Sequence, residues 1–363
     1  MDENPVQADG DSGWVSPEMV LAQLQSCVAG LFAEHHDVRV LSIQEISAGW
    51  ESDVYAFDAA LDGDQERLVL RIYPGNDATR KSALEYEALR ALGRVGYPVP
   101  AVYRLVQEGS PFGDGATGRG RPFLIMEWVP GRGMWRETFH GSEEARTAHF
   151  DRFCSLLVQL HALDWRAFVA EGTTAFAGDP YASVDAGLVL LRQWLERMGQ
   201  RGYLPLVDWL AERRESVPCE RPAPIHWDFH PENLLLCDDG RVVVIDWTQF
   251  QIADPRFDLA WTMTLVGSQE GGDVRERILE RYVALSAQPV DQIEVFEVFA
   301  CVKRLASVTI SLAAGAEQLG MRPGAEQSMR QHFPALKRVY RRVQDITGAS
   351  ISEVESMFAG DGR

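Results

Sequence analysis

The sequence lacks most of the features that mark secreted and membrane proteins. It has no apolar run approaching the roughly 20 residues that cross a bilayer, and its first five residues, Met1–Pro5, have neither the basic start nor the apolar core of a signal peptide. Its five cysteines are scattered, with no CxxC pair, so neither a disulfide framework nor a zinc site is indicated. We therefore expect a cytoplasmic protein whose thiols are reduced.

Basic residues are also few relative to acidic ones. Thirty-five lysines and arginines face 53 acids, which gives a formal net charge of −18. Such a surface repels nucleic acid and anionic membranes and attracts cationic ligands, although an acidic surface also serves solubility alone. The composition excludes a nucleic-acid-binding role, mildly favours a cationic small molecule as ligand, and leaves the oligomeric state open.

The most informative stretch is the polar run from His226 to Asn233, which precedes the apolar segment Val242–Ile245. Asp228, Asn233 and Asp246 form the set that phosphoryl transfer needs, with one carboxylate to orient or deprotonate a hydroxyl and two oxygen ligands for Mg²⁺. An Asp-Gly turn before the apolar segment predicts a β-hairpin. That hairpin would bring Asn233 and Asp246 to the same end of the ribbon.

The two histidines of this run allow an alternative. His226, Asp228 and His230 stand at alternate positions and resemble metal ligands on one face of a strand, as in a metal-dependent hydrolase. That interpretation leaves Asn233 and Asp246 without a role, and no other histidine cluster completes it. We expect His226 to be structural, bonded to backbone, and leave the role of His230 open.

The order of predicted elements favours an α+β fold with two lobes. Residues 1–15 are expected to be a disordered tail, 16–129 a β-rich N-lobe and 130–363 a helical C-lobe, with a cleft between the lobes. In the N-lobe, apolar alternation predicts strands over 38–46, 53–57, 67–73, 101–106 and 122–129, and helices over 16–34 and 78–92. In the C-lobe, helical periodicity covers 142–163, 184–200, 203–216, 256–267, 273–287, 291–316 and 324–346, interrupted by strands near 225–250.

Several of these motifs resemble those of the aminoglycoside phosphotransferase and choline-kinase-like family, which shares the protein-kinase fold. The resemblance rests on the catalytic run with Ile245-Asp246-Trp247, on Asp254–Ala260, on Leu160–Asp164 and on Met126–Gly131. It covers about Ile46 to Ala260 and is most specific at the catalytic run. It implies a small-molecule kinase that uses ATP, or GTP as an alternative, together with Mg²⁺.

The resemblance also implies roles for individual residues. Asp228 is the catalytic base or the residue that orients the hydroxyl, and Asn233 and Asp246 bind the metal. The backbone of Glu127 and Val129 bonds the adenine edge, and Met126 lines the nucleotide pocket. Asp258 would be structural and bind the backbone of the catalytic loop.

Phosphate binding falls to the N-lobe in this scheme. Arg71 stands where protein kinases place a phosphate-binding lysine, and Glu85 is its expected partner, with Glu87 as a rival. Ser47 and Ser52 flank a loop that matches the phosphate-covering loop by position only. Because Arg71 departs from the protein-kinase pattern, a nucleotide-binding but catalytically silent regulator remains an alternative.

Two further expectations concern the acceptor side. Trp227 stands where the family usually has glycine. Since a tryptophan adopts positive φ only at a cost, we expect an ordinary backbone conformation there or a packing or substrate-stacking role, with core packing favoured. The acceptor is a small hydroxyl compound such as an aminoglycoside, macrolide, choline or sugar. Four acids after residue 262 are candidates to line its site or to face water: Glu270, Asp273, Glu294 and Glu297.

Overall fold

The computed structural model describes residues 17–46, 52–75, 77–113, 120–169, 179–315 and 324–360. The chain forms two compact units. The first comprises Met1–Tyr86, Val102–Trp128 and Ala316–Ala325, and the second comprises Glu87–Ala101, Val129–Gly315 and Glu326–Arg363. The expected tail 1–15 lies outside the described residues. The boundary between the units at 128/129 lies next to the expected lobe boundary. Residues 87–101, which form the second half of a helix and the turn after it, belong to the second unit although they were expected in the N-lobe.

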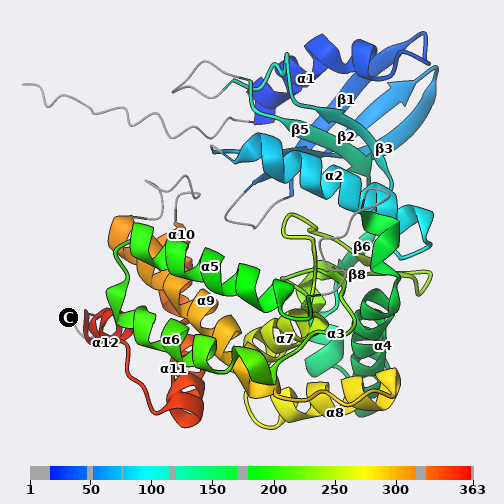
Figure 1. The fold of residues 1–363 in the computed structure, drawn as a ribbon. Helices are drawn as coiled ribbons and strands as arrows, with labels where there is room; N and C mark the ends of the chain where they lie inside the picture. The colour runs from blue at the N-terminus through cyan, green and yellow to red at the C-terminus, as the bar shows by residue number, and fades with distance from the viewer. Residues whose placement is uncertain are drawn as a thin grey trace, which may run out of the picture. The chain divides into compact units, whose positions relative to one another are not determined.

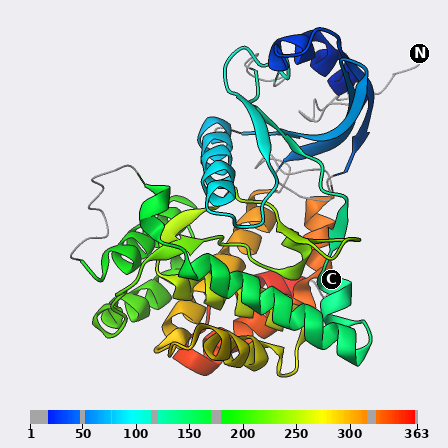
Figure 2. The ribbon, with the colours of Figure 1, turned by 90° about the vertical axis from the view of Figure 1, so that its right-hand side faces the viewer.

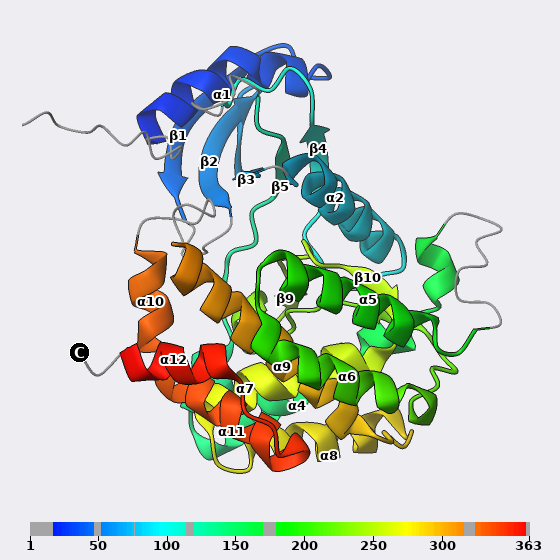
Figure 3. The ribbon, with the colours of Figure 1, turned by 60° about the vertical axis from the view of Figure 1, so that its left-hand side comes forward.

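The first unit is built on a five-stranded antiparallel sheet (Figure 3). Its strands lie in the order β1-β2-β3-β5-β4, so the first three form the expected meander. β2 and β3 are joined by Asp62 and Gly63, both at positive φ, as a two-residue hairpin turn requires. The bounds are β1 Val38–Glu45, β2 Asp53–Leu61, β3 Asp64–Ile72, β4 Val102–Val106 and β5 Phe123–Glu127.

Two helices cover opposite faces of this sheet (Figure 2). Leu68, Leu70 and Ile72 on β3 point to the core shared with helix α1 (Pro17–Leu31), while Val69 joins a second cluster with Ala78 at the start of α2 (Ala78–Arg94). Successive residues of a strand face opposite sides, so a run that is apolar at every position implies a sheet buried on both faces. The sequence pattern of β3 therefore positions Arg71, the neighbour of Leu70, on the α2 side.

The second unit is mainly helical (Figure 1). Phe257 of α7 packs edge-on against Phe296 and Phe299 of α9, with ring centroids 4.9 and 5.1 Å apart, so α7 and α9 form its core. The helices are α3 Trp135–Phe139, α4 Glu143–Ala162, α5 Ala182–Arg197, α6 Leu204–Glu212, α7 Pro255–Glu270, α8 Val274–Ser286, α9 Ile293–Ala314, α10 Ala325–Gln331, α11 Phe333–Thr347 and α12 Ser352–Gly360.

One predicted helix proves to be two. The segment expected to be helical over 324–346 is divided at His332 into α10 and α11, because Pro334 in the first turn of α11 disfavours a helical residue before it. α12 was not predicted. None of the described helices combines the length and the apolar character that a bilayer crossing requires.

Two small sheets carry the loops of interest in the second unit. One joins β6, β8 and β9, and the other joins β7 and β10. Their strands are β6 Gly131–Gly133, β7 Ala223–Ile225, β8 Leu234–Cys237, β9 Val242–Val244 and β10 Gln251–Ala253. The fold is thus α+β, with an antiparallel sheet in the first unit and helices predominating in the second, as the sequence predicts.

Candidate active site

Asp228 lies in the loop that leaves β7, and its carboxylate is held on two sides. Trp261 Nε1 of α7 donates to Oδ1 at 3.1 Å. Asn233 Nδ2 donates to the Asp228 carbonyl at 2.9 Å and approaches Oδ2 at 3.4 Å. The side chain remains 31% exposed, so the carboxylate has a fixed orientation and an open face.

The charge on this carboxylate is stabilised by its surroundings. Burial alone would raise the pKa of Asp228, but His230 and His226 attract the negative charge and Trp261 donates a hydrogen bond to it, so the pKa lies well below the usual range of an aspartate. His230 Nε2 is 3.6 Å from Oδ2. Asp228 is therefore ionised at neutral pH and acts as a hydrogen-bond acceptor.

The backbone before Asp228 is strained. Trp227 has φ +64°, so the expected ordinary conformation at this residue is wrong. The left-handed region costs a residue other than glycine about 1–2 kcal/mol and persists only where the surroundings enforce it. Here the buried carboxylate of Asp258 accepts both the His226 N–H, at 2.7 Å, and the Trp227 N–H, at 2.9 Å. Asp258 thus binds the catalytic-loop backbone, as the sequence analysis proposed.

The Trp227 ring has the packing role that was favoured. It lies 5.2 Å from the Phe257 ring and 6.3 Å from that of Trp261, both on α7. Lys303 of α9 places its Nζ 4.0 Å from the Trp227 centroid and 4.7 Å from that of Trp261. The indole therefore links the catalytic loop to α7 and α9.

His226 uses both ring nitrogens on backbone groups. Nε2 lies 2.9 Å from the carbonyl oxygen of Ile245, and Nδ1 accepts the Asp228 N–H at 3.2 Å. Neither nitrogen is left for a metal, which removes one of the three ligands that the hydrolase alternative needs. Within the described residues, no group of three or more His, Cys, Asp or Glu side chains is placed to hold a metal ion.

The hairpin of β8 and β9 has the register that the Asp-Gly turn predicts. Leu234 pairs with Val244, and Ile245 N–H donates to the Asn233 carbonyl at 2.9 Å, so Asn233 and Asp246 lie at the same end of the ribbon. Since Asn233 Nδ2 already donates to Asp228, its Oδ1 is the atom offered to a cation. An amide oxygen and a carboxylate suit Mg²⁺, which completes its shell with phosphate oxygens and waters.

In the first unit, Arg71 forms a buried ion pair with Glu85 of α2. Arg71 Nη1 donates to Glu85 Oε1 at 3.0 Å, and the Tyr73 hydroxyl donates to Glu85 Oε2. The glutamate side chain is 1% exposed. The rival Glu87 is 66% exposed and lies 3.9 Å from Arg90. Glu85 therefore fixes the orientation of the Arg71 guanidinium.

The other proposed nucleotide contacts are distributed over both units. Met126 is buried against the α2 face of the sheet, and Glu127 ends β5. Val129 packs in a small cluster of the second unit with Cys237 and Val243. Ser52 is buried, and Ser47 lies outside the described residues.

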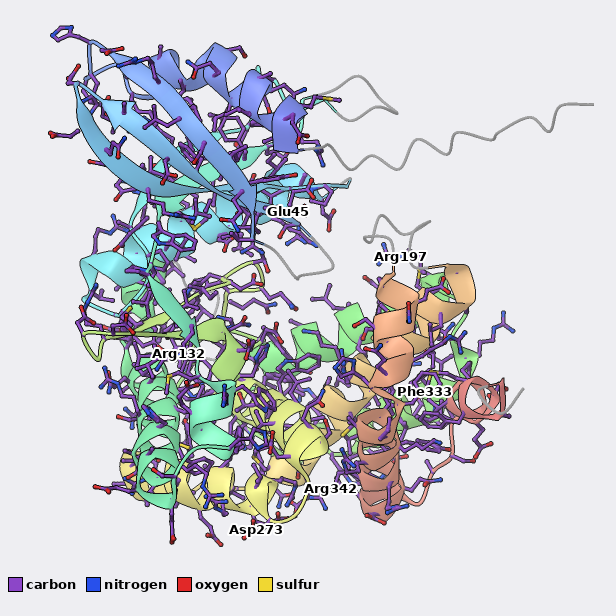
Figure 4. The ribbon with its side chains drawn as sticks, turned by 180° about the vertical axis from the view of Figure 1, so that it is seen from behind. Glu45, Arg132, Arg197, Asp273, Phe333 and Arg342 are labelled. Atoms are coloured by element: carbon purple, nitrogen blue, oxygen red, sulfur yellow. The ribbon has the colours of Figure 1, made fainter. Side chains whose placement is uncertain are left out.

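The acids expected on the acceptor side have other roles. Glu297 neither lines a site nor faces water, because it is fully buried between Arg275 Nη2, at 2.9 Å, and Arg342 Nη2, at 2.7 Å. Glu270 accepts a hydrogen bond from Trp135 Nε1 at 2.5 Å. Glu294 is exposed, and Asp273, labelled with Arg342 in Figure 4, is 77% exposed. The prediction of an acid-lined site is therefore wrong for Glu297.

The ion pairs of Glu297 predict how stability depends on acidity. Burial would raise the pKa of Glu297, but the hydrogen bonds from Arg275 and Arg342 outweigh it, and the pKa is lowered. The stabilisation is therefore complete above the ordinary pKa of a glutamate and is lost as the pH falls through the lowered folded-state value. In acid titrations followed by circular dichroism, Glu297→Gln should be less stable at pH 7 and should lose stability less steeply below about pH 4.5. Equal slopes in both proteins would contradict this assignment.

Sequence patterns alone did not identify three residues of this region, Trp261, Lys303 and Arg304. Trp261 lies three positions after Asp258, so one face of α7 supplies both side chains that hold the loop. Lys303 and Arg304 are adjacent cations in α9, which is mainly apolar and largely buried. Two adjacent charged residues within a buried helix indicate that these residues have a specific role, because charged side chains are seldom buried. This pattern is visible in the sequence.

A family model and a curated relative each match much of this chain. The model of a family described as the phosphotransferase enzyme family matches residues 42–290. Among curated proteins, mouse acyl-CoA dehydrogenase family member 10 is 24% identical over 258 residues, which is 66% of this chain but only 22% of that protein's length.

Solved structures share the fold at low identity. The aminoglycoside phosphotransferase APH(4)-Ia, in a ternary complex of a thermostable mutant with AMP-PNP and hygromycin B, gives a TM-score of 0.57 at 15% identity, covering 91% of this chain and 99% of that one. Choline kinase LicA from Streptococcus pneumoniae gives 0.55 at 15% identity, covering 89% and 98%. The protein-kinase-like fold implied by the sequence motifs is confirmed.

Proposed function

Because the chain belongs to the phosphotransferase enzyme family, we propose that it transfers the γ-phosphate of ATP to a hydroxyl group of a small molecule. The observation that carries this proposal is the ionised Asp228 carboxylate, fixed between Trp261 and Asn233 beside the hairpin end that bears Asp246. A carboxylate, an amide oxygen and a second carboxylate in this arrangement are the polar groups of a phosphoryl-transfer site. The structure of APH(4)-Ia with AMP-PNP supports ATP as the donor, and GTP is the alternative to be tested.

Asp228 is proposed to orient the acceptor. Its carboxylate accepts a hydrogen bond from the acceptor hydroxyl, whose oxygen then bonds to the γ-phosphorus as the bond from that phosphorus to the ADP oxygen breaks. The hydroxyl proton passes to Asp228 late, once the oxygen has become acidic by bonding to phosphorus. The low pKa of Asp228 favours this orienting role over early deprotonation, because a weakly basic carboxylate is a poor general base.

Asn233 and Asp246 are proposed to bind Mg²⁺, which would neutralise charge on the phosphates. In the first unit, Arg71, held by Glu85, is proposed to bind donor phosphate. A guanidinium stays cationic and can bind phosphate oxygens in pairs, so it can replace a lysine there. The contacts proposed for adenine are Met126 and the backbone of Glu127 and Val129, with Ser47 and Ser52 near the phosphates. The cytoplasm is the proposed location, supported by five free cysteines.

A screen of small hydroxyl compounds with γ-labelled ATP tests the proposal. Mg²⁺-dependent transfer to one of them is expected with the wild type and not with Asp228→Asn. ATP binding without transfer to any acceptor would instead support the silent regulator. Stoichiometric zinc or iron in the purified protein would support a metal-dependent hydrolase. The bonding of both His226 ring nitrogens to backbone groups argues against that alternative.

The ion pair of the first unit gives a separate prediction. Glu85→Gln removes the charge that orients Arg71, so the KM for ATP should rise about tenfold, equivalent to ~1.4 kcal/mol of binding free energy. Steady-state kinetics at saturating acceptor measure this. Glu87→Gln is the matched control, since Glu87 is exposed on the same helix, and it should change the KM less than twofold. Equal effects of the two substitutions would show that Glu85 does not position the phosphate-binding group.

A further inference from the structure

Helix α9 brings two adjacent cations to the catalytic loop. Lys303 lies over the Trp227 and Trp261 rings, at 4.0 and 4.7 Å, and its Nζ donates to Gln249 Oε1 at 2.9 Å. Arg304, the next residue, interacts electrostatically with the Asp228 carboxylate. α9 is otherwise mainly apolar and largely buried, so neither cation is placed there by the need for a soluble surface.

Arg304 is the more informative of the two. Its side chain is half-buried, yet within the described parts of the chain its guanidinium donates no hydrogen bond and forms no ion pair closer than 4 Å. A guanidinium has five N–H donors, and none of the Arg304 nitrogens is a fully buried atom without a partner, so they still reach solvent. Burial also lowers the pKa of Arg304, and the nearby Asp228 charge opposes this shift. These donors are therefore available to a ligand.

The two oxygens of Asp228 have different neighbours. Oδ2 lies towards Asn233, which is proposed to hold Mg²⁺ and thus the donor phosphates. Oδ1 is bonded to Trp261, whose ring is covered by Lys303. Lys303 thus lies over the indole that binds Oδ1, and Arg304 is the next residue on the same helix.

Two of the acids that were expected on the acceptor side are engaged by other residues. Glu297 is fully buried with two arginines, and Glu270 is engaged by Trp135. Asp258 is occupied by two backbone N–H groups. The net charge of −18 describes the surface as a whole, whereas the residues next to Asp228 on α9 are both positive.

We infer that the acceptor carries an anionic group, a carboxylate or a phosphate, and that Arg304 binds this group with Lys303 beside it. This inference rests on the proposed function and narrows its substrate class to anionic alcohols. A planar guanidinium matches a carboxylate or phosphate with two parallel hydrogen bonds, so the bound anion would fix the distance from the charged group to the hydroxyl presented to Asp228. Because the Asp228 carboxylate is negative, it would repel the anionic group of the acceptor, so that the acceptor hydroxyl lies next to Asp228.

Matched acceptor pairs test the inference. In the labelled-ATP screen, gluconate should be a better acceptor than glucitol, or glycerol 3-phosphate better than glycerol, and choline and kanamycin should be poor. A comparison of gluconate with glycerol 3-phosphate shows whether the site prefers a carboxylate or a phosphate. Arg304→Gln should raise the KM for the acceptor at least about tenfold, the loss of one charge-assisted contact, and leave the KM for ATP within twofold. Arg192→Gln on α5, paired with Asp208 at the surface, is the control and should change neither constant.

The kinetic outcomes distinguish an acceptor-binding, a donor-binding and a structural role of Arg304. A rise in the KM for ATP with no change for the acceptor would assign Arg304 to the donor phosphate and overturn the inference, as would a preference for neutral or cationic acceptors. A lower melting temperature of Arg304→Gln with unchanged kinetics would assign it a structural role. No such fall is expected, because the Arg304 guanidinium donates no hydrogen bond to any residue that the structure describes.

A binding measurement keeps the inference testable if no compound of the panel is phosphorylated. Inorganic phosphate is titrated into the full chain saturated with Mg²⁺ and AMP-PNP, with tryptophan fluorescence as the readout because Trp227 and Trp261 adjoin Lys303. A saturable change in the wild type that is lost in Arg304→Gln supports an anion site even where catalysis fails. No saturable change in the wild type refutes the site without bearing on the proposed transfer reaction.

Discussion

Asp228→Asn is expected to lower turnover at least about a hundredfold, the scale of losing one positioned acid–base group. Asparagine has the shape of aspartate, and its Oδ1 can still accept the hydrogen bond from Trp261 Nε1. What the variant loses is the negative charge that holds the acceptor hydroxyl and finally takes its proton. The KM for ATP should stay within about twofold, because the proposed donor contacts lie on other residues.

The matched control for this variant is Asp239→Asn. Asp239 belongs to the turn between β8 and β9, where it binds Arg241 at 2.7 Å and is exposed. The same chemical change at that position should leave turnover unaffected. The melting curve of Asp239→Asn should match that of the wild type, whereas Asp228→Asn loses the attraction between its charge and His230 and should melt at a lower temperature. If Asp228→Asn kept a third or more of the wild-type turnover with an identified acceptor, Asp228 would not be the residue that orients the hydroxyl.

The elements that the sequence predicts well are those set by local patterns. The alternation in β3 and the two-residue turn before it lie within one hairpin, and they predict which side of the sheet carries Arg71. The Asp239-Gly240 turn likewise predicts the register that brings Asn233 and Asp246 together. In each case the residues that decide the structure are within about ten positions of one another, so no tertiary information is required.

The elements that the sequence does not predict depend on distant contacts. Trp227 adopts a left-handed backbone because Asp258, 31 residues later, binds its N–H. In the sequence, Glu297 cannot be distinguished from an exposed acid. Its structural role depends on Arg342 of α11, which binds its carboxylate in the folded protein. Arg304 interacts electrostatically with Asp228 from a helix that the sequence pattern identifies as part of the core. Residue identities and their spacing thus predict the catalytic loop. The residues that hold this loop in place, and those proposed to bind the acceptor, are positioned by packing between elements that are distant in the sequence.

Asp258→Ala is expected to have the largest effect on stability. The substitution leaves the N–H groups of His226 and Trp227 buried without acceptors, at about 1–3 kcal/mol each, so unfolding of the second unit should become easier by roughly 2–6 kcal/mol. The strained φ of Trp227 loses its restraint at the same time, so the loop should relax and turnover should fall. Urea denaturation followed by tryptophan fluorescence measures this, because seven of the ten tryptophans lie in Val129–Gly315.

Asp208→Ala distinguishes this effect from the loss of any aspartate. Asp208 is exposed and pairs with Arg192 on the surface, so its removal should cost at most about 1 kcal/mol. If the two variants were equally stable, the two hydrogen bonds from the backbone to Asp258 would not be what holds Trp227 at positive φ. Trp227→Gly in the Asp258→Ala background adds a second measure. Glycine adopts this φ without strain, so turnover should recover in part if backbone relaxation caused its loss, and should not recover if Asp258 acts through His161, whose Nε2 lies 3.2 Å from the same carboxylate.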